Sequence, residues 1–252
     1  MRRWSAGALL LLAVPAQAES SLRLVMIDQD SPPYLTGVGR ELANPPGLAV
    51  ELVQLAARRC ALRLEVNRLA SLRMLQSLRS GMADAALLLS YNPERGGYAH
   101  YPMRNGVPDS RYRLTTLSYS FYVRSDSHIR WNGRALSGFA GRVGTDLGWS
   151  VVRDLEQLGI EVESAVGVPV NLGKLRLGRI KVYAAQSIIV ESYLQDQRDI
   201  VALKPPIATK DYFLPFSQSF AASNPQAVQC MWQQIAEQRD ALYRQRAREY
   251  EP

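Results

Sequence analysis

The sequence has few of the residues that catalysis and metal binding most often use. Its 252 residues include two histidines and two cysteines, and these four side chains show no metal-ligand spacing. It also lacks a Gly-x-Ser-x-Gly elbow, a Gly-x-Gly-x-x-Gly fingerprint and a phosphate-binding loop. We therefore expect no catalytic residue, no metal and no cofactor.

Long apolar runs and dense basic runs are absent as well. No stretch has the roughly 20 apolar residues that a membrane helix needs. The net charge of +7 is spread along the chain, so we expect no nucleic-acid partner. The start of the chain combines Arg2 and Arg3, an apolar run over 6–14 and a small-residue site over 16–18. This order is typical of a secretory signal peptide, so we expect residues 1–18 to be removed and the rest to be exported.

The two cysteines, Cys60 and Cys230, leave two interpretations open. An isolated pair in an oxidising compartment favours a disulfide, whereas two buried thiols would act as small apolar side chains.

The most informative stretch runs over 81–95. The apolar run from Ala85 to Leu89 predicts one fully buried strand that ends at the hydroxyl of Ser90. Residues 92–94, Asn-Pro-Glu, then predict the start of a helix, with Arg95 in its first turn. A strand that ends in a polar turn is where open α/β sheets bind ligands, and a hydroxyl beside a guanidinium suits a carboxylate.

Strands and helices alternate along both halves of the chain, which predicts α/β sheets covered by helices. In the first half we expect strands over 22–27 and 62–66, and helices over 48–59 and from Ser71 to Gly81, with Ser71 as the N-cap. In the second half the pattern predicts the following elements: strands over 117–123, 142–145, 161–166, 182–185, 200–203 and 211–216, and helices over 150–158, 172–177, 188–194 and 225–248.

Several segments, taken in order, resemble the periplasmic solute-binding protein family of the type II fold, in particular its amino-acid-binding group (bacterial extracellular solute-binding family 3). The matching segments are Pro-Pro-Tyr at 32–34, Gly-Leu-Ala-Val-Glu-Leu at 47–52, the helix end at 78–84, Ser90 with Arg95, Leu-Arg-Leu-Gly-Arg-Ile at 175–180, and Tyr-Phe-Leu-Pro-Phe-Ser at 212–217.

This resemblance implies two α/β lobes, each a mixed, mostly parallel sheet flanked by helices, joined by two hinge crossings. The first lobe would hold 19–118 plus 214–252, and the second 122–210, with hinges near 117–123 and 208–216. It also implies a periplasmic location, a monomer, and a Cys60–Cys230 bridge near the C-terminal helix.

The resemblance further implies a ligand site in the cleft between the lobes. Tyr34 would stack on the ligand, and Ser90 and Arg95 would bind its carboxylate. The turn Gly148, Trp149 and Ser150 would complete that site with backbone amides. The structural alternatives are an Arg95–Glu94 ion pair, a capping role for Ser90, and core packing for Tyr34 and Trp149.

Two positions depart from the family pattern. Gln186 stands where an aspartate usually holds the ligand's ammonium, and Lys181 replaces the aspartate of the preceding strand. A neutral amide does not neutralise an ammonium. The departure at this position therefore favours a carboxylate ligand without an amino group. Asp28, Asp30 and Glu191 are candidates for the missing charge.

The function that follows from the resemblance is capture of a small carboxylate-bearing ligand, a polar amino acid or a related organic acid, for an ABC-type importer and its inner-membrane permease. Two alternatives stay open. One is a cleft enzyme of the dehydratase type with Glu191 or Asp30 as its acid, and the other is a ligand sensor without a transporter.

Overall fold

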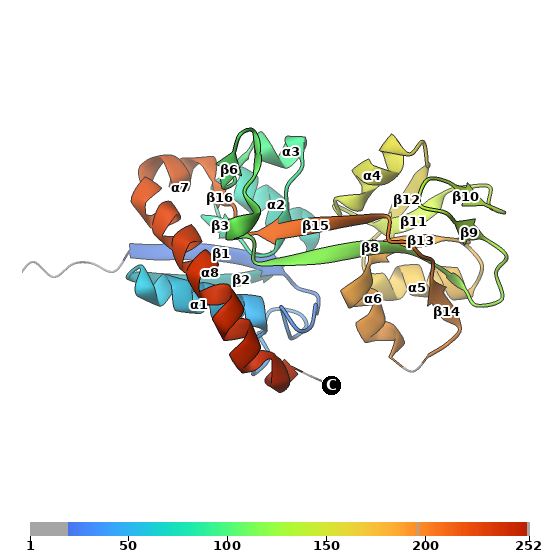
Figure 1. The fold of residues 1–252 in the computed structure, drawn as a ribbon, viewed down its shortest axis with the longest axis horizontal. Coiled ribbons are helices and arrows are strands. Elements are labelled where there is room, and N and C mark those ends of the chain that lie inside the picture. Colours follow the sequence, from blue (N-terminus) through green and yellow to red (C-terminus); the bar gives the residue numbers. More distant parts are fainter. Residues whose placement is uncertain (1–19, 196, 251–252) are drawn as a thin grey trace, which may run out of the picture.

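The computed structural model describes residues 20–195 and 197–250, and shows two lobes joined by a pair of long strands (Figure 1). The predicted signal peptide lies outside the described residues. None of the described helices is both long and apolar enough to cross a membrane.

The first lobe is built on a five-stranded sheet in the order β2-β1-β3-β16-β5. β1 pairs in parallel with β2 and β3, as the alternation of strands and helices predicts, whereas β16 runs antiparallel to β3 and β5. The bounds of its strands are β1 Ser20–Ile27, β2 Leu62–Leu69, β3 Ala85–Ala86, β5 Ala99–His100 and β16 Phe216–Ser217.

Helices enclose the core of this lobe: α1 Leu48–Arg59, α2 Ser71–Arg79, α3 Pro93–Gly96, α7 Gln218–Ser223 and α8 Pro225–Arg246. The loop before the crossing carries the hairpin β6 Met103–Arg104 and β7 Val107–Pro108 and the short helix η1 Ser110–Tyr112, and η2 Ala247–Tyr250 follows α8. α1 lies against α8, and a disulfide joins Cys60, the residue directly after α1, to Cys230 of α8. This confirms the disulfide and excludes the pair of free thiols.

The second lobe is built on the larger sheet, in the order β12-β11-β13-β8-β15-β4, with β14 paired to β8. Its elements are β8 Thr115–Arg124, β9 Arg130–Trp131, β10 Leu136–Ser137, β11 Val143–Asp146, α4 Val151–Gln157, β12 Val162–Ala165, α5 Val168–Arg176, β13 Tyr183–Gln186, α6 Ser187–Leu194, β14 Ile200–Ala202 and β15 Ala208–Phe213. β11 pairs in parallel with β12 and β13.

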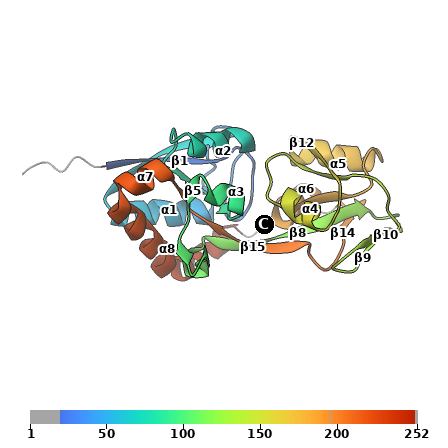
Figure 2. The ribbon, with the colours of Figure 1, turned by 90° about the horizontal axis from the view of Figure 1, so that it is seen from above.

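The antiparallel strands β8 and β15 run from one lobe to the other (Figures 1 and 2). The resemblance implies two crossings between the lobes, and β8 and β15 are two such strands. The residue limits of the lobes and of the hinges, as given above, stay predictions.

The single strand predicted over 85–89 is wrong. Leu88 has a φ of +55°, in the left-handed region, and this bend divides the run into two short strands. β3 joins the sheet of the first lobe, whereas β4 (Leu89–Ser90) pairs with β15 in the larger sheet. The run therefore links the two sheets and still ends at Ser90, as predicted.

Several other boundaries differ from the prediction, among them the following three. The N-cap of α2 is Ala70, and the Ser71 hydroxyl makes no capping bond. The helix predicted to begin at 172 begins at Val168, directly after Gly167. The last crossing strand begins at Ala208 rather than at 211, so Lys210 lies within it.

A buried arginine fixes the loop that follows β1. Arg68, on β2, is only 4% exposed, and its guanidinium donates to five backbone carbonyls, one at the end of β1 and four in that loop. They are Ile27 at 3.2 Å, Gln29 at 3.1 Å, Thr36 at 3.4 Å, Gly37 at 2.5 Å and Glu41 at 2.6 Å. Burial lowers the pKa of Arg68, and the nearby Asp30 and Asp28 partly offset this.

We predict that Arg68→Met lowers the free energy of unfolding by at least about 3 kcal/mol, because it leaves buried carbonyls without donors. Urea denaturation followed by circular dichroism measures this loss. Arg63→Met is the matched control: Arg63 lies on the same strand, but it is exposed and pairs with Glu65, so we expect a change below about 1 kcal/mol. Equal losses in the two variants would contradict the role of Arg68.

Candidate functional site

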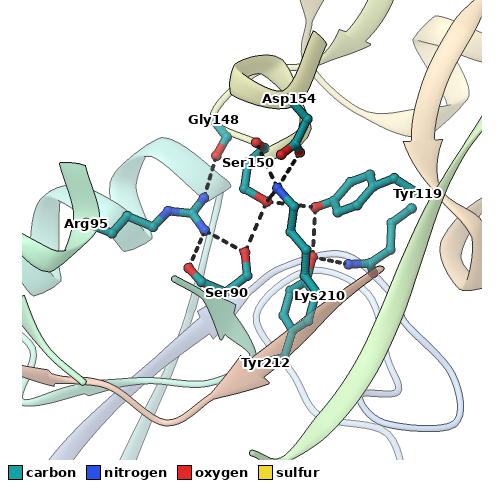
Figure 3. Close-up of polar contacts among 9 residues, drawn as sticks. Ser90, Arg95, Tyr119, Gly148, Ser150, Asp154, Lys210 and Tyr212 are labelled. Carbon is teal, nitrogen blue, oxygen red and sulfur yellow. Dashed lines mark hydrogen bonds and ion pairs between the residues drawn. The ribbon is translucent and has the colours of Figure 1, made fainter. Parts of the chain in front are cut away.

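Arg95 and Ser90 lie at the junction between the lobes (Figure 3). The Asn92 side chain accepts a hydrogen bond from the Arg95 N–H at 2.8 Å, which caps the short helix α3 as predicted. Arg95 is 6% exposed, and its Nη1 donates to both the carbonyl and the Oγ of Ser90, at 2.9 and 3.0 Å. Its Nη2 donates to the carbonyl of Gly148, in the second lobe, at 3.0 Å. The guanidinium therefore bridges the two lobes.

In the second lobe, the turn that follows β11 contacts Arg95. Gly148 has a φ of +82°, a conformation that favours glycine, and presents its carbonyl to the first lobe. Ser150 is buried, and its Oγ accepts a hydrogen bond from the Oγ of Ser90 at 3.0 Å. The two serines form a second direct contact between the lobes.

Lys210 extends from the crossing strand β15 into the same junction. Its Nζ donates to the carbonyl and the Oγ of Ser150, both at 3.2 Å, and pairs with the carboxylate of Asp154 on α4. Burial lowers the pKa of Lys210, and the hydrogen bond and charge of Asp154 oppose that shift. A cation of the protein itself thus lies beside the predicted ligand groups.

A chain of hydroxyl groups connects Gln186 to this cluster. The Nε2 of Gln186 donates to the hydroxyl of Tyr212 at 2.8 Å, which in turn lies 2.8 Å from the hydroxyl of Tyr119. The Oγ of Ser150 donates to Tyr119 at 3.5 Å. Burial raises the pKa of both tyrosines, so they remain neutral hydrogen-bonding groups.

The cavity enclosed by these groups is small. It has a volume of about 50 Å³ and is lined by Arg95, Gln186 and Ser150 among others. That space suits a few water molecules rather than an amino acid. In this structure the predicted ligand groups are bonded to one another across the junction of the lobes.

A second, larger cavity of about 630 Å³ lies beside the first, and both are lined by Ser71 and Trp149. The first lobe contributes the loop after β1 and the start of α2, and the second lobe contributes the ends of β11 and β12 and the start of α5. Cavities of this size accommodate drug-sized ligands.

No protein-family model matches the sequence, and no curated protein matches it either. Solved structures do match. They include arginine-binding protein ArgBP of T. maritima in its holo form, with 16% identity over 90% of this chain and 95% of that one, at a TM-score of 0.68. The substrate-binding protein of an amino acid ABC transporter matches with 12% identity over 92% and 99% of the two chains, at a TM-score of 0.70.

A third structure is the sensor domain of a histidine kinase with similarity to periplasmic binding proteins. It has 17% identity over 92% of this chain and 96% of that one, at a TM-score of 0.70. Matches over nearly the whole length of both chains, together with two lobes and two crossings, decide the architecture. The chain has the type II periplasmic binding protein fold.

Within this type II fold, six of the seven predicted site residues gather at the junction of the lobes. Ser90, Arg95, Gly148, Ser150 and Gln186 bond to one another or to the crossing strands, and Trp149 lines both cavities. Tyr34 lines neither of these two cavities: it packs against the cores of both lobes, and its ring lies 5.8 Å from that of Tyr243. The ligand contacts of all seven predicted site residues stay predictions.

The acids considered for the missing charge have different surroundings. Asp30 accepts a hydrogen bond from the Gly37 N–H at 2.9 Å, and burial raises its pKa. Glu191 is exposed on α6, whereas Asp28 lines the larger cavity.

Sequence reasoning missed Lys210 and Asp146. Lys210 came before the strand boundary that the pattern predicted, so its place in the crossing was not apparent. Asp146 comes after a predicted buried strand, as Ser90 does. Ser90 was singled out because Arg95 lies close to it in the sequence, whereas Asp146 has no such neighbour.

Asp146 is the acid that the fold buries most completely in this region. It is 2% exposed, and the Tyr183 hydroxyl donates to its Oδ2. Its Oδ1 has no hydrogen-bond partner among the described residues. Burial raises the pKa of Asp146 to about 6, although Tyr183, the Asn171 amide and the Gly167 N–H each act to lower it.

We predict that this carboxyl makes the protein less stable as the pH rises from about 4 to about 6. The unfolded side chain titrates near its ordinary pKa of 3.8 and the folded one near 6, so the folded state holds the proton more tightly in this window. The difference corresponds to about 3 kcal/mol of stability, present below pH 4 and lost as the pH rises through 6.

Urea denaturation of wild type and Asp146→Asn at pH 4, 5, 6 and 7 measures this effect. We expect Asp146→Asn to lack this part of the pH dependence and to be more stable than wild type at pH 7. Asp126→Asn, at an exposed position, is the matched control and should follow the wild-type profile closely. Parallel profiles for wild type and Asp146→Asn would refute the assignment.

Proposed function

We propose that the protein is an exported, monomeric solute-binding protein that captures a small carboxylate-bearing ligand between its lobes and delivers it to an ABC-type importer. The observation that carries this proposal is the buried guanidinium of Arg95, which contacts Ser90 in one lobe and Gly148 in the other. The forked guanidinium of an arginine matches the two oxygens of a carboxylate. The guanidinium of Arg95 lies at the junction of the lobes, where a ligand would contact both of them.

Closure around a ligand requires an exchange of partners at Arg95. In this structure its Nη2 donates to the Gly148 carbonyl, so a ligand carboxylate would replace that carbonyl as acceptor. The Ser90–Ser150 contact would open to admit it. A charged acceptor forms a stronger hydrogen bond than a neutral carbonyl, which favours the exchange.

Two neighbours support the transport role by analogy of fold, because they are an arginine-binding protein and the substrate-binding protein of an amino acid ABC transporter. The ligand class remains the broader one, a polar amino acid or a related organic acid, since Gln186 supplies no negative charge.

A second candidate function, a ligand sensor without a transporter, is favoured by the histidine kinase sensor domain that shares the fold. Co-purification with an inner-membrane permease, tested with ligand present, separates the two roles. A stable complex with a permease supports import, whereas binding to the periplasmic part of a kinase supports sensing.

We predict that Arg95→Ala weakens binding of the carboxylate ligand at least tenfold, equivalent to about 1.4 kcal/mol. Isothermal titration against a panel of amino acids and organic acids first identifies the ligand and then measures the loss. Arg95→Lys keeps the charge but loses the fork, so we expect an intermediate affinity. Arg124→Ala is the control, because Arg124 is an exposed arginine paired with Asp126 at the far end of β8. Unchanged affinity in Arg95→Ala would remove Arg95 from the site.

A further inference from the structure

Lys210 has a place in the junction that the proposed carboxylate site does not explain. It lies on the crossing strand β15, its side chain is 16% exposed, and its Nζ donates to the carbonyl and the Oγ of Ser150 (Figure 3). A lysine ammonium has three N–H donors and no acceptor. Toward Lys210, the Ser150 hydroxyl therefore acts only as an acceptor.

The proton of the Ser150 hydroxyl has no close acceptor. Its Oγ accepts hydrogen bonds from Lys210 at 3.2 Å and from the Oγ of Ser90 at 3.0 Å. Its own proton is donated to the Tyr119 hydroxyl at 3.5 Å, which is long for a bond between two hydroxyl groups. Ser150 is thus a donor that is held beside the cleft with only a weak partner.

Ser90 has the same hydrogen-bond direction. The Nη1 of Arg95 donates to its Oγ at 3.0 Å, and a guanidinium, like an ammonium, has no acceptor. A hydroxyl that accepts from a cation becomes a stronger donor, because consecutive hydrogen bonds polarise one another. Arg95 thus directs the proton of Ser90, and Lys210 directs that of Ser150.

The charges of this cluster are unbalanced in the same sense. Lys210 pairs with Asp154, whereas Arg95 makes no ion pair within residues 20–195 and 197–250. Glu94, the acid next to it in sequence, pairs instead with Arg79 at 2.8 Å. Burial lowers the pKa of Lys210, and the nearby charge of Arg95 adds to that shift. The two cations share one acid, so an anion between the lobes would balance the second cation.

We infer that Lys210 is a positioning residue of the proposed carboxylate site, which directs the Ser150 hydroxyl to donate and, together with Arg95, makes the site select an ionised carboxylate over a neutral carboxamide of the same shape. The inference rests on the proposed function, because it assigns the selectivity of that same site. Asp154 holds Lys210 in place but contributes a charge that repels the ligand.

Acetate and acetamide are the matched probes, because they have nearly the same shape and differ in charge. Titration of the whole ¹⁵N-labelled protein at pH 7.5 and constant ionic strength, followed by the amide chemical shifts of Gly148, Trp149 and Ser150, measures both affinities. We expect saturable binding of acetate and at least tenfold weaker binding of acetamide. Equal affinities, or no saturable binding of acetate, would overturn the inference.

Variants at Lys210 test its part in this selectivity. Lys210→Met should weaken acetate binding at least fivefold, and Lys210→Arg, which keeps a positive charge and N–H donors, should recover part of the loss. Lys204→Met is the matched control, because Lys204 is exposed and lies before β15. It should bind acetate as wild type does. Equal affinities in Lys210→Met and Lys204→Met would refute the role of Lys210.

Asp154→Asn separates this role from a structural one. If the ion pair only held α4 against β15, its loss would weaken acetate binding in Asp154→Asn as much as in Lys210→Met. The inferred role predicts equal or tighter binding in Asp154→Asn, because a negative charge beside the anion is removed while Lys210 remains. The double variant Lys210→Met/Asp154→Asn leaves neither charge of the pair alone and should bind acetate at least threefold more weakly than wild type. Wild-type affinity in the double variant, or a shared loss in the two single variants, would contradict the inference.

The failure of this inference differs from the failure of the proposed function. Carboxylate binding that depends on Arg95 but not on Lys210 would reject the inference alone. Absence of any carboxylate binding that depends on Arg95 would reject the proposed function, and the inference with it.

Discussion

The Arg95 guanidinium is the interaction on which the arrangement of the lobes depends. The crossing strands β8 and β15 join the lobes, and contacts between side chains across the junction add to this connection. Arg95 binds the end of β4 and the turn after β11 at once, and Ser90 with Ser150 reinforces this contact. The groups that we propose for ligand binding are thus the ones that connect the lobes in this structure.

This arrangement sets a thermodynamic condition on any ligand. A ligand shifts the lobes only by the difference between its free energies of binding to the open and closed states. Because Arg95, Ser90 and Ser150 are already satisfied by one another and by Gly148, a carboxylate gains only the excess of its own bonds over those it displaces.

Much of the architecture could be predicted from local patterns, and the failures have identifiable causes. The helix over 48–59 and the capped turn at Asn92 follow from periodicity and capping, which depend on near neighbours in sequence. The bend at Leu88 does not, because an apolar run looks the same whether one sheet or two receive it. Ser90 and Arg95 were found because they lie five residues apart. Lys210 and Asp146 have partners supplied by tertiary folding, so no local spacing marked them.

Two buried charges show how differently the fold compensates for the burial of a charge. Arg68 donates to five carbonyls, so its burial is compensated and the loop after β1 is held in place. Asp146 is buried as well, and burial raises its pKa although hydrogen bonds from Tyr183, Asn171 and Gly167 oppose the shift. The loop that Arg68 holds carries Asp28 and Gln29 into the wall opposite Asp146. A buried charge whose hydrogen bonds are made within the first lobe thus positions one wall of the larger cavity.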